Sequence, residues 1–490
     1  MSEKGGRSSE SEHDQHHVHD AAPQRTGAAR IYYHPLTQVV LLGLVLFMTP
    51  GMFNALNGLG AGGQVDSQTS ANANSTLYAT FAFTAFFAGS INNKLGSRLT
   101  LFIGSLGYSL YIASYLAMEI HSNAGPFVIT AGAILGICAG LIWTAHGAII
   151  LSLPTESQKG LYISICWSLF NLGAVVGAAV ALGQNINSRA SAVGTPTYIG
   201  FLVLTLIGAI IPLFMVPTDK MYRTDGSRVT ISRNPSWKVE FTSLFYALYK
   251  DPLIVLLLPM FWASNWFYTW QFNAYNAALF DIGARSVNNF VYWLSQILGS
   301  VIIGVLLDSK NMSRRMRAFL GWGILTVMVF VVHIWAYFYQ KDYTREQTEA
   351  KDFQHINIHD KGYPARVWLY IFCGLLDSMW QTAIYWMMGA MSNDPAKLAY
   401  FTGLYKSIQS AGGAVAWRAD GLKVPYMNLF ISTWVLLAAG LVFALPMLHL
   451  RVKNHTDLED EVIARMDDSG RILNVEEAEQ KLGTVHKEAP

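Results

Sequence analysis

The sequence predicts an all-α membrane protein of twelve transmembrane helices, arranged as two pseudo-symmetric six-helix bundles. Of its 490 residues, 52% are hydrophobic and only 13% are charged, whereas a soluble protein usually carries about a quarter charged residues. Two short segments also occur twice. Phe-Asn-Ala-Leu-Asn at 53–57 returns as Phe-Asn-Ala-Tyr-Asn at 272–276, and Gly-Leu-Tyr-Ile-Ser-Ile at 160–165 returns as Gly-Leu-Tyr-Lys-Ser-Ile at 403–408. The chain therefore contains one membrane unit twice.

Twelve long apolar stretches supply the helices, each near the length of about twenty residues that crosses roughly 30 Å of hydrocarbon. They group into a first bundle at 36–217 and a second bundle at 252–449. The predicted spans are 36–55, 76–92, 99–120, 127–153, 161–182 and 198–216, followed by 253–280, 287–307, 318–339, 367–391, 398–417 and 426–448.

Three polar segments flank and join the bundles. Residues 1–35 contain no apolar core of a signal peptide and are predicted to be a disordered cytoplasmic tail. Residues 218–251 are a linker rich in arginine and lysine, and 450–490 form a second polar tail. Both termini are predicted to be cytoplasmic, because the linker and the short loops on its side carry most of the lysine and arginine. These loops contain Lys94, Arg98, Lys159, Lys310, Arg314, Arg315, Arg317 and Lys397, against Arg189, Arg285, Arg418 and Lys423 on the other side.

Two features belong to the predicted outer side. The loop 340–366 is long and mixed in charge, and it explains why the second repeat pair is spaced further apart than the first. The sequon that begins at Asn74 falls at the outer mouth of the second predicted span, which makes Asn74 a glycosylation candidate close to the membrane.

Composition and motifs argue against several functions. A net charge of +2 is too small to indicate nucleic-acid binding, and the chain has no nucleotide-binding loop, nucleophile elbow or paired zinc-histidine motif. Cys138, Cys166 and Cys373 all lie in apolar stretches, so they indicate neither a disulfide framework nor a zinc site. We expect no enzyme activity, no cofactor and no metal.

Two loops on the predicted inner side resemble a known signature. Residues 89–98 read Gly-Ser-Ile-Asn-Asn-Lys-Leu-Gly-Ser-Arg, and their second-half counterpart runs from Gly304 to Asp308 with basic residues after it. Both are similar to the inner-loop signature of the major facilitator superfamily, in which glycine permits a close helix approach and an acid with nearby bases latches the halves. Asn93 stands where the family has Asp, so the first latch lacks its acid. The resemblance implies gating roles for Gly89, Asn93, Lys94, Gly96, Arg98, Gly304 and Asp308; ordinary flanking charge is the alternative.

The first, seventh and eighth spans carry a narrower resemblance. Residues 53–64, residues 262–273 and the sequence Tyr292-Trp293 with Gln296-Ile297 and Gly299 resemble the ion-channel-regulatory Unc-ninety-three-like branch of that superfamily, in particular its fungal members. The resemblance covers nearly all twelve spans. It implies either a transporter or a protein that keeps the fold and controls other membrane proteins, and it brings no established catalytic residues.

Amides on the first and seventh spans are the first substrate-contact candidates. Asparagines three apart share one face of a helix, and an amide inside hydrocarbon needs a partner. In the superfamily these two spans line the central cavity, which implies substrate contact for Asn54, Asn57, Gln271, Asn273 and Asn276. Hydrogen bonding between helices is an equally good explanation. The glycines after Asn57 predict a flexible outer gate or a close-packed turn.

Asp377 and Lys406 are the two charges deepest in predicted spans. Each costs about 2.5 to 3.5 kcal/mol at a helix centre unless it is paired or hydrated, so we expect them to pair. Lys406 corresponds to Ile163 in the repeat, so only the second half carries this charge. The pair is either structural or the means by which a proton and an anion are bound.

Three further residues complete the cavity candidates. His146 could titrate near neutral pH, although a lone intramembrane histidine more often makes one hydrogen bond. Trp143 and Trp380 could line a cavity for an apolar or planar ligand, whereas many such aromatics only anchor helices at the interface.

Two functions remain open from the sequence. In the first, the protein moves a small solute by alternating access of its two halves, with possible proton coupling through Asp377. In the second, it does not transport and instead regulates another membrane protein. The expected partners are the lipid bilayer, a small solute or a second membrane protein.

Overall fold

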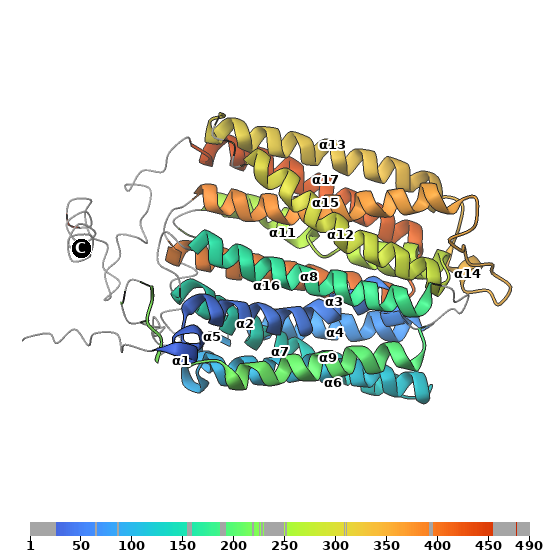
Figure 1. Cartoon of the computed structure of the whole chain (residues 1–490). Helices are drawn as coiled ribbons and strands as arrows, with labels where there is room; N and C mark the ends of the chain where they lie inside the picture. Colours follow the sequence, from blue (N-terminus) through green and yellow to red (C-terminus); the bar gives the residue numbers. More distant parts are fainter. Residues whose placement is uncertain are drawn as a thin grey trace, which may run out of the picture.

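The computed structural model describes residues 26–63, 66–85, 88–153, 159–186, 193–217, 252–307, 311–391 and 395–453, together with a few positions outside these ranges. The described chain is almost entirely helical, and an isolated β-bridge joins Phe280 to Ile356. The long helices run side by side in two groups, which Figure 1 shows in blue to green for the first half and in yellow to red for the second. The predicted division into two helical bundles is therefore present.

The first bundle contains six spans, of which the first two are each divided. The short helix α1, Gly27–Tyr32, precedes them within the predicted tail. The spans are α2 Pro35–Met48 with α3 Pro50–Gly58, α4 Ser67–Ala85 with α5 Ala88–Leu95, α6 Ser97–Ile120, α7 Gly125–Ser152, α8 Lys159–Asn185 and α9 Thr195–Phe214.

The break in the first span follows from one proline. Pro50 has no N–H to donate and crowds the residue before it, so Thr49 leaves the helical region with φ −110° and ψ −83°. The Thr49 hydroxyl donates to the Val45 carbonyl at 2.6 Å. The span is thereby divided into α2 and α3, and α3 carries the repeated Phe-Asn-Ala-Leu-Asn segment.

Small residues bring α4 and α7 into close contact. Gly132, Gly136 and Gly140 follow one another at four-residue intervals on α7. A Cβ atom at Gly132 would stand 2.4 Å from the Ala73 carbonyl oxygen, and one at Gly136 would stand 2.1 Å from that of Leu77. This spacing of glycines lets two membrane helices approach backbone to backbone. Larger residues there would separate the second and fourth spans.

The second bundle repeats the six spans, but its first span is more irregular. Its elements are η4 Pro252–Leu257, α11 Leu258–Ala263, η5 Thr269–Ala277, α12 Ile282–Leu307, α13 Arg314–Gln340, α15 Tyr363–Met391, α16 Pro395–Gly421 and α17 Tyr426–Arg451. The helix α14, Arg345–Thr348, lies in the loop between α13 and α15.

Polarity distinguishes the spans at the contact between the bundles. Within the described ranges, nine helices are long and apolar enough to cross a membrane. The other three spans are α4 with α5, the interrupted seventh span and α16. The bundles meet mainly where α4 packs against α16 and α8 packs against α12. Two of the less apolar spans therefore face each other, and protein takes the place of lipid around their polar residues.

Three helices extend beyond their predicted spans for the same reason. The second span begins at Ser67 rather than 76, the eighth at Ile282 rather than 287, and the eleventh ends at Gly421 rather than 417. Arg285 was assigned to a short outer loop but lies buried inside α12. Polar residues at these helix ends bond to the opposite half, so a search for apolar runs stops too early.

The long helices end on two opposite sides of the protein. The terminal end is where α1 begins and α17 finishes, and the α14 end is the opposite one (Figure 1). The inner loops of the sequence analysis lie at the terminal end, and the loop 341–362 lies at the α14 end. Most of the predicted linker 218–251, most of both tails and Asp308 are outside the described residues.

Candidate functional site

The seventh span is interrupted where it meets the first half. After α11 it turns at residues 264–266 and continues as η5, a π-helix over Thr269–Ala277. π-Helices are rare because their i→i+5 hydrogen bonds are less favourable, and they occur frequently at functional sites. All three predicted substrate contacts of this span, Gln271, Asn273 and Asn276, lie in η5 and are buried.

Asp377 lies in α15 and is surrounded by neutral hydrogen-bond donors. Its side chain is 1% exposed. Gln296 Nε2 donates to Oδ2 at 2.6 Å, Gln381 Nε2 donates to Oδ1 at 2.7 Å, and the Tyr292 hydroxyl is 2.9 Å from Oδ2. The same hydroxyl is 2.8 Å from Gln271 Oε1, which connects the carboxyl group to the π-helix.

The predicted ion pair between Asp377 and Lys406 is wrong. Neither side chain forms an ion pair with a residue that the structure describes. Two glutamines separate the charges instead. Lys406 Nζ donates to Gln409 Oε1 at 3.0 Å, Gln409 Nε2 is 3.4 Å from Gln381 Oε1, and Gln381 contacts Asp377. The acid and the base are therefore joined by neutral amides, and neither charge is neutralised by direct contact.

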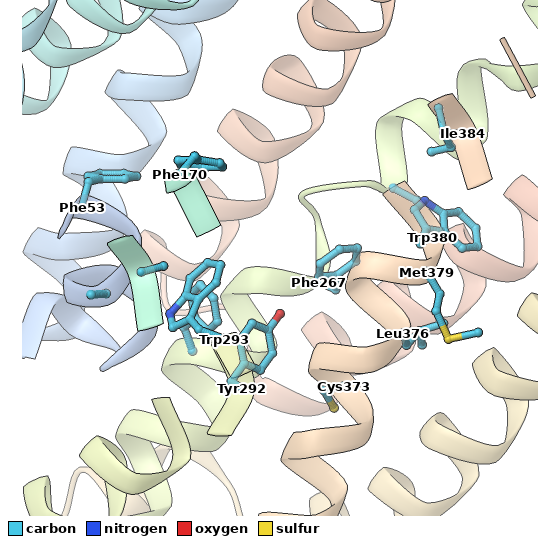
Figure 2. Packing of buried hydrophobic residues seen from close by; sticks show 14 of the residues in the cluster. Phe53, Phe170, Phe267, Tyr292, Trp293, Cys373, Leu376, Met379, Trp380 and Ile384 are labelled. Carbon is cyan, nitrogen blue, oxygen red and sulfur yellow. The ribbon is translucent and has the colours of Figure 1, made fainter. Parts of the chain in front are cut away.

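Aromatic rings surround the same region. The Lys406 ammonium lies 5.1 Å from the ring centre of Tyr405 and 5.6 Å from that of Tyr385, both within the range of cation–π attraction. Figure 2 shows Tyr292 and Trp293 projecting from α12, with Phe53 of the first half on one side and α15 on the other. These contacts place the Asp377 network beside the boundary between the two bundles.

The glycines that follow α3 form a close-packed turn at the α14 end. Gly60, Gly62 and Gly63 have φ of 76°, 60° and 79°, values that a residue with a side chain rarely adopts. A Cβ atom at Gly60 would stand 2.1 Å from the Phe272 carbonyl oxygen. Of the two predicted readings, a flexible gate or a packed turn, the structure has the packed turn. We call residues 58–63 the glycine turn.

Buried donors of the second half hold the glycine turn and the end of α3. Asn276 Nδ2 donates to the Gly58 carbonyl at 2.9 Å, and Asn289 Nδ2 donates to the Ala55 carbonyl at 2.6 Å. Arg285 donates through Nε to the Leu59 carbonyl at 2.7 Å and through Nη2 to that of Gly60 at 2.5 Å. Because these are backbone acceptors, the contact depends on the conformation of the turn rather than on its side chains.

Asn273 extends this contact to the loop outside the spans. Its Oδ1 accepts from the Ala61 N–H at 2.8 Å, and its Nδ2 donates to Asp420 Oδ2 at 2.7 Å. Asp420 also forms an ion pair with Arg345 of α14, with Nη2 2.5 Å from Oδ1. The Arg345 guanidinium lies 4.1 Å from the ring centre of Tyr426. One chain of buried polar contacts thus runs from the glycine turn to α14.

The first copy of the repeat is arranged differently. Asn57 Nδ2 donates to Asn74 Oδ1 at 3.2 Å, within the first half. Asn54 is half-buried, and its amide makes no hydrogen bond with the described residues. Asn74 is fully buried inside α4 rather than at the outer mouth of the span, and its glycosylation stays a prediction. The helix begins earlier than its apolar run, which moved Asn74 inward.

The remaining cavity candidates separate into two groups. Trp380 is fully buried and its Nε1 lies 3.2 Å from Ser264 Oγ, so it packs against the interruption of the seventh span and presents no surface to a solute. Trp143 and His146 are half-buried on α7, with ring centres 5.5 Å apart in an edge-to-face arrangement. They lie in the first half, and none of their described contacts joins them to the Asp377 network.

The predicted gating loops lie at the terminal end and are only partly described. Asp308 falls outside the described residues, as do the surroundings of Gly89 and the side chain of Asn93. Arg98 donates to the Leu213 carbonyl, and Lys94 is exposed. A Cβ atom at Gly96 or Gly304 would meet nothing within 4 Å, so close helix approach does not explain these two glycines in this conformation. Gly96 has φ 78° and precedes α6, which accounts for glycine there.

Several residues of the site were missed in the sequence. They are the amides, one arginine and one acid that connect spans, namely Arg285, Asn288, Asn289, Gln296, Gln381, Gln409 and Asp420, with Arg345 in the loop. The sequence contains a signal for two of these residues, Gln381 and Gln409. Gln381 follows Asp377 by four residues and Gln409 follows Lys406 by three, so each pair shares a helix face.

Comparison with known proteins gives the family. A family model described as ion channel regulatory protein UNC-93 matches residues 62–446. The chain belongs to the UNC-93 family. An UNC93-like protein of Schizosaccharomyces pombe is 45% identical over 432 residues, which are 88% of this chain and 86% of the relative. UNC93-like protein 1 of Arabidopsis thaliana is 38% identical over 426 residues, covering 86% of this chain and 92% of the relative. The resemblance inferred from the sequence is confirmed.

Solved structures show the fold of this UNC-93 family member. A D-xylose–proton symporter superposes with a TM-score of 0.58 at 14% identity, covering 87% of this chain and 100% of the symporter. A structure of a proton-dependent oligopeptide transporter gives a TM-score of 0.58 at 14% identity, covering 86% and 99%. These likenesses confirm the predicted major facilitator fold. At this identity they show the fold alone.

Proposed function

We propose that the protein moves a small solute across a membrane by alternating access of its two bundles, with Asp377 as the group that exchanges a proton. One observation carries the proposal. Asp377 is a buried carboxyl group held by neutral donors at the boundary of the bundles, and it has no ion-pair partner among the described residues.

The chemistry of the donors suits a reversible charge. A carboxylate locked to a cation resists protonation, because the cation would then be left buried and unpaired. Gln296 and Gln381 each carry an acceptor oxygen beside the donor nitrogen. Either amide can therefore rotate to accept from the protonated acid, and Asp377 can change charge with little rearrangement.

Lys406 would receive an anionic group of the solute. Its ammonium has three donors, and Gln409 takes up one of them in the described structure. Gln381 and Gln409 connect this ammonium to Asp377, so a change of charge at either residue would alter the hydrogen bonding of the other. Asn54, whose amide makes no hydrogen bond within the described part of the chain, is the first-half residue best suited to contact the same solute.

Reconstituted protein tests the proposal. Proteoliposomes loaded with the pH dye pyranine would be given an inward proton gradient and a panel of carboxylates, sugars, nucleosides and dipeptides. We expect wild-type protein to acidify the lumen with at least one solute, and Asp377→Asn to lose acidification by at least tenfold. The control Asp342→Asn changes an exposed acid at the α14 end and should leave the rate within twofold.

Two results would oppose the proposal in different ways. Asp377→Asn protein that acidifies the lumen as fast as wild type would remove the proton role and leave transport intact. Folded wild-type protein that moves none of the panel would favour the second function, a regulator of another membrane protein.

The regulatory alternative rests on the description of the family model as an ion channel regulatory protein. It predicts a different sensitivity to mutation. In cells that depend on the gene, a regulator should tolerate Asp377→Asn but fail when exposed residues of the loop 341–362 are replaced. A transporter should show the reverse.

We also propose that the terminal end faces the cytoplasm. Lys94, Arg98, Arg314, Arg315 and Arg317 all lie at that end, and the excess of basic residues in short loops sets the orientation of a membrane protein. A cysteine-labelling reagent that cannot cross the membrane should reach a cysteine placed at exposed Lys351 and should not reach one placed at exposed Lys94 in intact cells.

A further inference from the structure

A basic cavity lies between α13 and α15 at the terminal end, away from the Asp377 network. It has a volume of about 300 Å³ and is lined by Arg314, Arg317, Trp386, Gly389 and Ala390. Its arginines come from the first turn of α13, and its other residues from the last turns of α15. α13 lies at the margin of the second bundle in Figure 1. We propose that this cavity binds the phosphate headgroup of an anionic lipid.

Arg317 is held in a conformation that suits an anion. Its Nη1 donates to the Leu307 carbonyl at 2.6 Å, and its guanidinium lies 5.8 Å from the ring centre of Trp386. Its Nε is buried and makes no hydrogen bond, and Arg317 forms no ion pair with a described residue. The buried Nε is out of reach of a ligand, but Nη2 makes no hydrogen bond with the described residues, so this end of the planar guanidinium can donate to a phosphate oxygen.

The position of Arg314 adds positive charge to the same cavity. Ser313 caps α13, its hydroxyl accepting from the Met316 N–H at 3.2 Å, so Arg314 stands at the first helical position. The positive end of a helix dipole attracts anions. Arg314 has a further interaction of its own, so Arg317 together with the helix dipole supplies the main attraction for whatever occupies the cavity.

The surroundings favour a lipid over a free anion. Met316 and Leu320 share a face of α13 beside Arg317 and are 58% and 39% exposed. Acyl chains can lie on this apolar face while the headgroup reaches the arginines. Trp386 has the amphipathic ring that is enriched at membrane interfaces. Basic pockets between transmembrane helices on the cytoplasmic side bind anionic headgroups, and the terminal end is the one that we place there.

Binding can be measured on the full chain in detergent by native mass spectrometry. The probes are dioctanoyl phosphatidic acid, dioctanoyl phosphatidylcholine and inorganic phosphate. We expect phosphatidic acid to bind at least tenfold more tightly than either of the others. Arg317→Gln should weaken that binding at least tenfold. Arg366→Gln is the matched control, because Arg366 also lies on an aromatic ring, at 4.6 Å from the centre of Tyr339, but belongs to the α14 end.

A second variant keeps the test decisive if Arg317→Gln does not fold. A Cβ atom at Gly389 would meet nothing within 4 Å, so Gly389→Leu should fill the cavity without a clash while both arginines remain. It should abolish binding of phosphatidic acid. Unchanged binding in Gly389→Leu, or equal loss in the Arg366→Gln control, would overturn the site. Inorganic phosphate that binds as tightly as phosphatidic acid would overturn the assignment to a lipid.

Discussion

The two copies of Phe-Asn-Ala-x-Asn occupy matching places but form different helices. α3 and η5 each begin three residues before the phenylalanine and end one residue after the second asparagine. The first copy is an α-helix and the second is a π-helix. In the first copy Asn57 bonds within its own half and Asn54 makes no hydrogen bond with the described residues, whereas in the second copy Asn273 and Asn276 both bond to the backbone of the opposite half.

Asparagines at matching positions of the two copies therefore have different roles. The second copy closes the α14 end, because its amides satisfy carbonyl and N–H groups of the glycine turn. The first copy leaves the half-buried amide of Asn54 without a hydrogen bond to the described residues. A repeated motif therefore identifies symmetry-related positions, and the helix geometry and the neighbours of each copy determine what the position does.

Among the substitutions that test this comparison, Arg345→Met should cause the largest loss of stability. The ion pair of Arg345 with Asp420 is buried, with side chains 4% and 1% exposed, and Asp420 in turn orients Asn273 of the π-helix copy. Removing one partner leaves a buried charge unpaired, which costs about 3 to 5 kcal/mol. Thermal unfolding of purified protein in detergent would measure the loss.

The control for this change is Lys423→Met. Lys423 pairs with Glu349 at 2.9 Å, but the side chains are 48% and 39% exposed, so the loss should be at most about 1 kcal/mol. Equal destabilisation by the two substitutions would show that the buried Arg345–Asp420 pair contributes no more to stability than the exposed pair does.

A pair of asparagine substitutions tests the two copies directly. Asn273→Leu leaves the Ala61 N–H and Asp420 Oδ2 without this partner, which should cost about 2 to 4 kcal/mol. Asn54→Leu removes an amide that makes no described hydrogen bond, so unfolding should change by less than about 0.5 kcal/mol. Asn54→Leu should reduce solute uptake while leaving the stability of the protein nearly unchanged. If both variants unfold at the same temperature, the two asparagines contribute equally to stability and the proposed difference between the copies is wrong.

The smallest expected effect concerns pH. His355 lies in the loop at the α14 end, where burial and the nearby charge of Arg285 lower its pKa. Below its ordinary pKa of about 6.5 the unfolded chain therefore binds more protons than the folded one, and stability falls as pH decreases further. His355→Gln should flatten this decrease between pH 7.5 and 5.5.

The pH measurement also sharpens the comparison. Arg285 is the residue that bonds to the glycine turn, so the closure formed beside the second copy should carry a small pH dependence. Melting curves of wild type, His355→Gln and His359→Gln, a change at the exposed neighbour, would measure it. Identical slopes in all three proteins would contradict the role of His355.

The sequence predicts spans well where lipid surrounds them and poorly where protein does. α17 faces outward, and its predicted range agrees with the structure to within three residues at each end, whereas α4 begins nine residues before its predicted start. α4 and α16 pack against each other across the bundles and carry Ser, Thr, Asn and charged residues at the α14 end, so their true ends lie beyond the apolar runs. Hydropathy measures compatibility with lipid and gives no account of polar contacts between helices.

The candidate site also has residues that the sequence could predict and contacts that it could not. Asp377 and Lys406 could be selected because a charge inside a span is costly wherever it lies. Their separation by Gln381 and Gln409 could not, because it depends on the rotation of α15 and α16 about their axes. The pairing of Arg345 in a loop with Asp420 in a span also joins residues that are distant in the chain.

The sequence by itself determined the membrane setting, the duplication and the two charges deepest in the spans, Asp377 and Lys406. Each follows from composition or from comparison of the chain with itself, and each rests on the cost of placing polar groups in hydrocarbon. Only the tertiary structure decided that the second Phe-Asn-Ala-x-Asn is a π-helix, that Asn74 is buried and that Asp377 contacts amides rather than Lys406. The physical reason is that a hydrogen bond depends on distance and direction, which are fixed only when helices from both halves pack together.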